Sequence, residues 1–307
     1  MHASARHGML EALIARFGRR FVIGVPMVFL LLVFAMPFLV VFKISISEVD
    51  GVRFADLVTW SDGLLKMQLK FTNYLTILFE DDLYLRAYLS SVGFAGLTTL
   101  ICLAFGYPFA YFLARSRPDI RPGLLMLLML PFWTSFLLRV YAWKMLLADN
   151  GVFNNLAIAA GMIAAPVKMM NTPFSLTLGM VYTYLPFMVL PLYANLVKMD
   201  LRLLEAARDL GATPWQAFWR ITVPLSRGGI IAGALLVFIP CVGEFVIPEL
   251  LGGPGTLMIG RVLWDEFFSN NDWPMAASVA VIMVLLIIVP LALFNKFQAE
   301  ATQGARA

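Results

Sequence analysis

Long apolar runs separated by short polar segments dominate the hydrophobic pattern of this 307-residue chain. Each run has about the 20 residues that an α-helix needs to cross ~30 Å of hydrocarbon at 1.5 Å per residue. The pattern therefore predicts six transmembrane helices, at residues 21–42, 88–114, 123–147, 174–197, 228–251 and 276–294. The first run follows Arg16, Arg19 and Arg20 as a signal peptide would, but it is longer than a ~7–15 residue signal core. We interpret it as an uncleaved helix.

Composition excludes an ordinary soluble protein. Hydrophobic residues make up 61% and charged residues 14% of the chain, with a mean hydropathy of +0.82. Soluble domains have roughly 45–50% apolar and 25% charged residues. We therefore predict an all-α polytopic membrane protein that forms a single transmembrane domain over residues 1–307.

The distribution of basic residues predicts the orientation of the chain, because Lys and Arg accumulate in cytoplasmic loops. They concentrate in residues 1–20, 115–121, 198–227 and 296–307. Both termini are therefore predicted to be cytoplasmic. The acidic segment 45–87 is predicted to be ordered and periplasmic, since its apolar content is too high for a disordered linker. The basic residues form no single stripe, which argues against nucleic acid as a partner.

No motif indicates catalysis by this chain. The sequence contains no phosphate-binding loop, no nucleophile elbow and no zinc-protease motif. The only histidines, His2 and His7, lie in the N-terminal tail, and Cys102 and Cys241 lie apart within apolar runs. We predict no catalytic residue, no metal site and no disulfide. A transporter built on this chain would take its energy from another subunit or from an ion gradient.

The polar segment 198–227 is longer than the ~2–8 residues that usually connect helices of a bundle. Residues 201–210 are rich in strong helix formers, and Gly211 suits the left-handed position after a helix. In this helix Arg202 and Arg208 flank Glu205. The segment therefore predicts a first short helix that ends at a fixed elbow.

A second helix is predicted directly after the elbow. Thr213 is its predicted N-cap, Pro214 its first residue and Gln216 its capping-box partner, and Pro224 is predicted to end it. Three large apolar side chains lie on this helix, namely Trp215, Phe218 and Trp219. Apolar surface of this size indicates burial, either against a partner protein or in the membrane interface among lipid.

The residues of this segment resemble a known motif. Glu205, Ala206, Ala207 and Gly211, followed by Ile221-Thr222-Val223-Pro224, are similar to the EAA motif of permease subunits of bacterial ABC importers. Val223 stands where that motif most often has Leu. The resemblance implies a type I (MetI-like) permease fold whose two cytoplasmic helices couple to an ATP-hydrolysing subunit through Glu205, Ala206, Ala207, Gly211 and Pro224. That subunit would hold ATP and Mg²⁺, and this chain would bind no cofactor.

Three further strings resemble the polyamine branch of these permeases, the putrescine permeases above all. They are residues 130–136 (LPFWTSF), 242–253 (VGEFVIPELLGG) and 258–264 (MIGRVLW). The resemblance implies ATP-driven import of putrescine or spermidine across the bacterial inner membrane. The implied partners are a second homologous permease, ABC ATPase subunits and a periplasmic polyamine-binding protein. Neighbouring branches for other small solutes share parts of these strings.

A path for a polyamine cation would need carboxylates and aromatic faces, because a bare charge is costly in hydrocarbon. Glu244, inside the fifth predicted span, is the first candidate, and Glu249 is a second. Trp133 and Tyr184, each near a proline, lead the aromatic candidates, ahead of Tyr141 and Tyr182. Each has a structural alternative: the carboxyl groups can be hydrogen-bonded between helices, and the aromatic rings can simply pack.

Prolines 131, 186, 191 and 240 are candidate bends for gating, with ordinary structural prolines as the alternative. Two other function classes remain in view. An ion-coupled secondary transporter would need more titratable groups within the spans. A membrane-embedded enzyme would need paired catalytic groups, which the sequence lacks.

Overall fold

The structure is a computed structural model that describes residues 21–47, 49–50, 53–54, 58–61, 64–67 and 70–304. The predicted N-terminal tail 1–20 and the last three residues of the predicted C-terminal tail lie outside the described residues. The chain divides into two compact units, residues 1–75 with 272–281 and residues 76–271 with 282–307. The prediction of a single domain over residues 1–307 stays a prediction.

The first unit begins with an apolar helix, Phe21–Ser45, that includes α2 (Met36–Ser45). Of its most apolar stretch, 0% is buried within the chain. Two small antiparallel hairpins follow, β1 (Val49–Asp50) with β2 (Arg53–Phe54) and β3 (Val58–Ser61) with β4 (Leu64–Met67), in which Val58 pairs with Met67. These strands lie in the segment 45–87, for which the sequence pattern predicted order but no strands.

Hydrogen bonds tie the end of the first helix to the other elements of its unit. Ser45 Oγ lies 2.7 Å from the hydroxyl of Tyr74 in α3 (Thr72–Leu75). Ser278, in the first turns of α15 (Trp273–Gly304), donates from Oγ to the carbonyl oxygen of Ser45 at 3.1 Å. Ser45 and Ser278 are fully buried, so these bonds satisfy polar groups that water does not reach.

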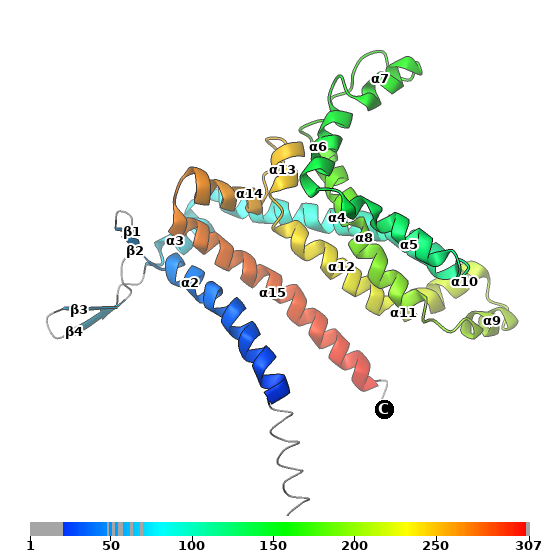
Figure 1. Ribbon diagram of the computed structural model, residues 1–307, viewed down its shortest axis with the longest axis horizontal. Helices are drawn as coiled ribbons and strands as arrows, with labels where there is room; N and C mark the ends of the chain where they lie inside the picture. Colours follow the sequence, from blue (N-terminus) through cyan, green and yellow to red (C-terminus); the bar gives the residue numbers. More distant parts are fainter. Residues whose placement is uncertain are drawn as a thin grey trace, which may run out of the picture. The chain divides into compact units, whose positions relative to one another are not determined.

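The second unit is helical and is built around α4, α8 and α12, which lie side by side in Figure 1. Its α-helices are α4 (Asp82–Arg115), α5 (Arg121–Met129), α6 (Phe136–Leu147), α7 (Val152–Ala159), α8 (Pro173–Leu196), α9 (Arg202–Asp209), α10 (Pro214–Ala217), α11 (Val223–Leu225), α12 (Arg227–Val242), α13 (Val246–Leu251), α14 (Ile259–Trp264) and the later part of α15. Tighter or wider turns occupy Thr76–Glu80, Leu130–Trp133, Phe218–Thr222 and Asp265–Ser269.

Three helices of the described chain are long and apolar enough to cross a membrane by themselves, namely Phe21–Ser45, Asp82–Arg115 and Pro173–Leu196. Two further candidates are bent pairs: Arg121–Trp133 with Phe136–Ala159, bent by 86°, and Pro214–Leu225 with Arg227–Val242, bent by 65°. A shorter apolar helix covers Trp273–Ile288. The all-α membrane fold is confirmed, while the count of six spans stays a prediction.

Two predicted spans are not single helices. The third, 123–147, breaks where Thr134 adopts an extended conformation (ψ 154°) after the Pro131 turn. The fifth, 228–251, ends at Val242, and residues 243–245 separate it from α13. Hydropathy did not reveal these breaks, because the residues around them are as apolar as those of a continuous helix.

Glycines allow α8 and α12 to approach closely. Gly229 and Gly233 lie four residues apart on α12, in the small-xxx-small spacing of tightly packed membrane helices. A Cβ atom at Gly233 would lie 2.7 Å from Met188 Sδ and 3.0 Å from its carbonyl oxygen, and one at Gly229 would lie 3.0 Å from Pro191 O. Fully buried Met188 and Leu192 fill the space around this contact.

We expect Gly233→Leu to destabilise the protein by about 1–3 kcal/mol, because the added side chain collides with the backbone of α8. The measurement is the temperature at which the purified, detergent-solubilised protein loses its monodisperse gel-filtration peak. Gly93→Leu is the matched control, since a Cβ at this exposed position of α4 meets no atom within 4 Å. Equal melting of both variants would contradict the close approach.

Candidate functional site

The segment between α8 and α12 forms the two predicted helices and their elbow. The first, α9, ends in a Schellman motif, in which the N–H of Ala212 donates to Ala207 O (2.9 Å) and the N–H of Gly211 donates to Arg208 O (2.8 Å). Gly211 has φ +85°, in the left-handed region that L side chains rarely adopt. The predicted role of Gly211 as the helix-ending residue is confirmed.

The second helix starts with the predicted capping box. Thr213 Oγ1 accepts from the N–H of Gln216 (3.3 Å), and Gln216 Oε1 accepts from the N–H of Thr213 (3.0 Å). The second helix continues through a π-helical turn (Phe218–Thr222) and α11, and it ends at Leu225, one residue beyond the predicted end at Pro224. The chain then bends by 65° into α12.

Aromatic rings seat the second helix on α4. Phe218 packs edge-to-face on Tyr107 (5.5 Å between ring centroids) and on Tyr111 (6.0 Å). The Tyr107 hydroxyl lies 2.8 Å from Ser226 Oγ, at the bend between α11 and α12. The sequence analysis missed Tyr107 and Ser226, although Tyr107 and Tyr111 are spaced as neighbours on one helix face.

The residues of the EAA string are largely open to contact. Glu205 and Ala206 are exposed, Ala207 is partly buried and Leu210 is 88% exposed. Trp215 and Trp219 are 69% and 52% exposed. The segment is thus fixed to the helical bundle through Phe218, while α9 and both tryptophans keep surface free for another molecule.

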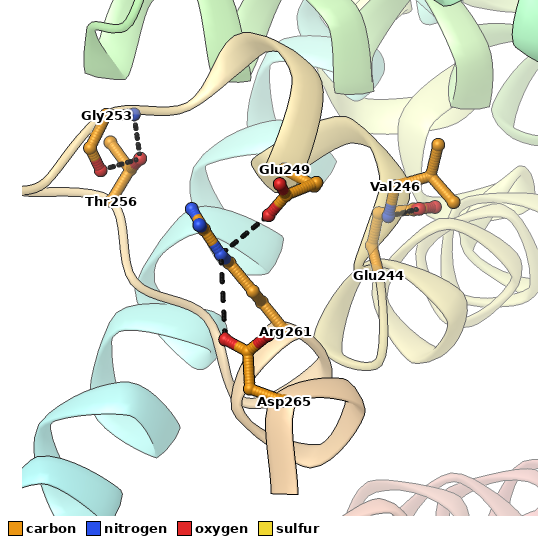
Figure 2. Close-up of polar contacts among 7 residues, drawn as sticks. All are labelled: Glu244, Val246, Glu249, Gly253, Thr256, Arg261 and Asp265. Atoms are coloured by element: carbon orange, nitrogen blue, oxygen red, sulfur yellow. Dashed lines mark hydrogen bonds and ion pairs between the residues drawn. The ribbon is translucent and has the colours of Figure 1, made fainter. Parts of the chain in front are cut away.

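Glu244 lies in the break of the fifth predicted span and is partly buried. Its Oε1 accepts from the N–H groups of Phe245 (3.2 Å) and Val246 (3.0 Å), so that the carboxylate caps the start of α13 (Figure 2). Its Oε2 accepts from the hydroxyl of Tyr184 on α8 at 2.5 Å. Two of the predicted site residues, Glu244 and Tyr184, are therefore in direct contact.

The start of α14 packs against the same break. A Cβ at Gly260 would lie 2.5 Å from Gly243 O and 2.6 Å from Glu244 O, so only glycine fits there. The N–H of Ile259 donates to the buried Ser91 Oγ of α4 at 2.8 Å. The backbone around Glu244 is thereby held on both sides, and neither Gly260 nor Ser91 was among the predicted site residues.

Glu249, an exposed residue of α13, is ion-paired. Arg261 Nε lies 2.8 Å from Glu249 Oε2 and 3.9 Å from Asp265 Oδ2 (Figure 2). These side chains are 34%, 53% and 48% exposed respectively. A cation that used Glu249 would have to displace the guanidinium of Arg261.

A chain of ring contacts connects Tyr184 with the break of the third predicted span. Phe187 lies 6.2 Å from Tyr184 and 5.3 Å, edge-to-face, from Phe132, and the guanidinium carbon of Arg139 lies 4.9 Å from the Phe132 ring. The predicted Trp133 is not part of this chain, because it is 83% exposed. Its neighbour Phe132 takes the inward position.

The other aromatic candidates pack elsewhere. Tyr182 contacts Trp143 edge-to-face at 5.3 Å, and Tyr141 is 48% exposed with the Lys144 ammonium 5.9 Å from its ring. Neither ring is in the chain of contacts that ends at Glu244. For Tyr182 the packing alternative of the sequence analysis accounts for its contact.

The chain is similar in sequence to permease proteins of bacterial transport systems. The chain is 41% identical over 273 residues to the spermidine/putrescine transport system permease protein PotB of Haemophilus influenzae, covering 87% of this chain and 91% of that protein. It is 44% identical over 225 residues to PotB of Escherichia coli K12 (73% and 81% covered). It is 31% identical over 230 residues to the Escherichia coli inner membrane ABC transporter permease protein YdcU (71% and 72% covered).

Solved structures share the fold. A chain of a bacterial ABC transporter involved in the import of the acidic polysaccharide alginate matches with a TM-score of 0.68 at 18% identity, covering 95% of this chain and 99% of that chain. A chain of the MetNI methionine ABC transporter matches with a TM-score of 0.53 at 16% identity, covering 70% and 94%. At these identities the likeness concerns the fold alone, and it confirms the predicted MetI-like permease architecture.

The family model of binding-protein-dependent transport system inner membrane components matches residues 106–300, which include the two-helix segment and both broken spans. Together with the relatives, this match shows that the chain belongs to the family of inner-membrane permease components of binding-protein-dependent ABC transport systems.

Proposed function

We propose that this chain is the permease subunit of an ATP-driven importer of polyamines, putrescine or spermidine. The observation that carries the substrate class is the 41% identity to a spermidine/putrescine permease over 87% of this chain. The site around Glu244, where a carboxylate meets the ring of Tyr184, suits a cationic substrate.

The two-helix segment α9–α10 is the proposed docking site for an ATPase subunit. Its elbow is fixed by backbone hydrogen bonds and its second helix by ring packing, while Glu205, Ala206 and Leu210 remain exposed. A segment held in this way would move as a rigid unit and would transmit a displacement caused by its partner to α4 and α12. The ATPase partner would supply the nucleotide, the Mg²⁺ and the hydrolysis.

The remaining partners and the orientation follow from the same proposal. A second homologous permease would complete the path, and a periplasmic polyamine-binding protein would deliver the substrate. The exposed apolar helix Phe21–Ser45 needs lipid or a second subunit as a covering. Basic residues in the proposed docking segment support its cytoplasmic location and, with it, cytoplasmic termini.

Glu244 and Tyr184 are the proposed centre of the substrate path, with Glu249 and Trp133 as outer candidates. A dication crossing the membrane needs compensating charge at depth. Glu244 supplies a carboxylate whose capping contacts to α13 hold it in one place. The capping role alone would account for its hydrogen bonds, so the two roles need a variant that separates them.

The proposed substrate class is tested in proteoliposomes that contain the complete complex with its ATPase subunits and binding protein. We expect ATP-dependent uptake of radiolabelled putrescine or spermidine that unlabelled polyamines inhibit and that amino acids do not. Uptake of another solute in preference to polyamines would contradict the substrate class and leave the permease family intact.

Gly211→Val should uncouple transport from ATP hydrolysis. A β-branched residue at φ +85° costs at least the ~1–2 kcal/mol of the left-handed region, which distorts the elbow. The readout is the number of substrate molecules imported per ATP hydrolysed in proteoliposomes, which we expect to fall.

Gly211→Asn is the matched control, because Asn tolerates the left-handed conformation better than Val. No atom lies within 4 Å of a Cβ at this position, so both variants differ in backbone strain and not in local collisions. Normal coupling in Gly211→Val would count against the docking proposal.

Glu244→Gln should reduce uptake by about tenfold or more, since a charge-assisted contact contributes about 1.5–3 kcal/mol and each 1.4 kcal/mol corresponds to a factor of ten. Glutamine keeps a carbonyl oxygen to cap α13, and its amide can donate to the Tyr184 hydroxyl. Basal ATPase activity and thermal stability should therefore stay close to those of the unmodified complex.

Tyr184→Phe serves as the comparison, because it removes one hydrogen bond to Glu244 and leaves the charge in place. We expect a smaller loss of uptake than for Glu244→Gln. Unchanged uptake kinetics in Glu244→Gln would remove Glu244 from the path and leave it the capping role alone.

A further inference from the structure

An apolar groove runs between α4 and the helical segment that leads from the elbow into α12. It has a volume of about 460 Å³, within the roughly 300–1,000 Å³ range of ligand-binding cavities. Its lining includes Leu100, Ala104 and Pro108 of α4 on one side and Trp215, Trp219 and Ile230 on the other. Leu100 is 65% exposed, so the groove faces out of the described bundle.

The face of α4 that lines the groove carries a cation, Arg115, farther along the helix. Leu100, Ala104, Tyr107, Tyr111 and Arg115 follow one another at intervals of four, three, four and four residues, which places them on one face of α4. Fifteen residues of helix span about 22 Å. Along this face of α4, apolar and aromatic side chains are therefore followed by the guanidinium group of Arg115.

Ring contacts place Arg115 close to the helix that carries Phe218. Its guanidinium carbon lies 5.1 Å from the centroid of the Tyr111 ring, and Tyr111 contacts Phe218, which also lines the groove. Trp215 and Trp219 contribute indole rings to the same wall. Tryptophan rings of this kind are enriched at the level of lipid head groups.

Two residues that adjoin lining residues through ring contacts or along the chain, without lining the groove themselves, carry polar atoms that lack a partner among the described residues. Arg115 Nη2 is buried and lacks a hydrogen-bond acceptor within the part of the chain that the structure describes. Thr222 Oγ1, four residues after Phe218, is likewise buried and unpartnered within that part. Arg115 as a whole is only partly buried, so the rest of its guanidinium group is available to pair with an anionic oxygen from outside the chain.

We propose that an anionic phospholipid of the cytoplasmic leaflet binds in this groove as a resident ligand of the permease. One acyl chain lies along the α4 face between Leu100 and Tyr107, and the phosphate group lies at Arg115. The lipid contacts α4 as well as Trp215 and Trp219, so its presence stabilises the packing of their helix on α4. An apolar groove with a cation nearby, linked to it through Tyr111 and Phe218, matches the chemistry of a phospholipid, which joins acyl chains to a phosphate group.

The test uses the full complex, extracted from membranes in a styrene–maleic acid polymer so that native lipids are retained. Native mass spectrometry after transfer to detergent counts the phosphatidylglycerol and phosphatidylethanolamine molecules that stay bound. We expect retained phosphatidylglycerol on the unmodified complex. Arg115→Gln should lower this retention about fivefold, the effect of losing one lipid-facing cation, and Arg115→Lys should restore most of it.

Ala104→Trp fills the groove from an exposed position and should displace the acyl chain. Leu89→Trp is its matched control on α4, since Leu89 is also exposed and lies outside the groove. Arg117→Gln is the control for Arg115, because Arg117 is an exposed cation that pairs with Asp119. The two controls should retain lipid like the unmodified complex.

A complex that carries no anionic phospholipid overturns the proposal, and so does equal retention in Arg115→Gln, Ala104→Trp and the controls. Retention of phosphatidylethanolamine and phosphatidylglycerol in equal amounts contradicts the role of Arg115. These outcomes leave the proposed substrate unaffected, because polyamine uptake is measured separately.

Discussion

The need to satisfy backbone polar groups away from water governs this structure, because hydrocarbon offers no hydrogen bonds to an interrupted helix. Both broken spans meet this need locally. Thr134 donates from its N–H and its hydroxyl to Pro131 O, and Glu244 accepts from the first N–H groups of α13. Breaks supported in this way are stable, so they can carry functional groups at a depth where a regular helix would leave no irregular backbone.

The contact between Phe218 and the two tyrosines of α4 links the docking segment to the rest of the bundle. It joins the proposed ATPase-docking surface to the helix that packs directly on α8 and α12. Because α8 carries Tyr184 and α12 leads into Glu244, a displacement of the segment has a short, rigid route to the centre of the proposed path. Because α12 packs closely on α8 at Gly233, these two helices have little room to shift relative to each other.

Local chemistry explains which features the sequence could predict. The elbow at Gly211 and the capping box of Thr213 and Gln216 depend on residues within one helical turn, so their patterns sufficed. Three of the predicted spans, at 21–42, 88–114 and 174–197, correspond to single long apolar helices for the same reason. The contacts of Glu244 with Tyr184 and of Arg261 with Glu249 depend on how α8, α13 and α14 pack, and no local pattern encodes that packing. The helix breaks were missed because mainly apolar residues surround them.

The π-helical turn at Phe218–Thr222 has a consequence for how this segment varies between related chains. A π turn holds one residue more than an α turn and arises where a single residue is inserted into a helix. Loss of that residue would rotate everything on its N-terminal side by about 100° relative to α12. The tryptophans would then face a different direction while α12 stayed in place. Insertion or deletion of one residue at this turn can therefore change the direction in which the proposed docking surface faces, while the membrane helices stay in place.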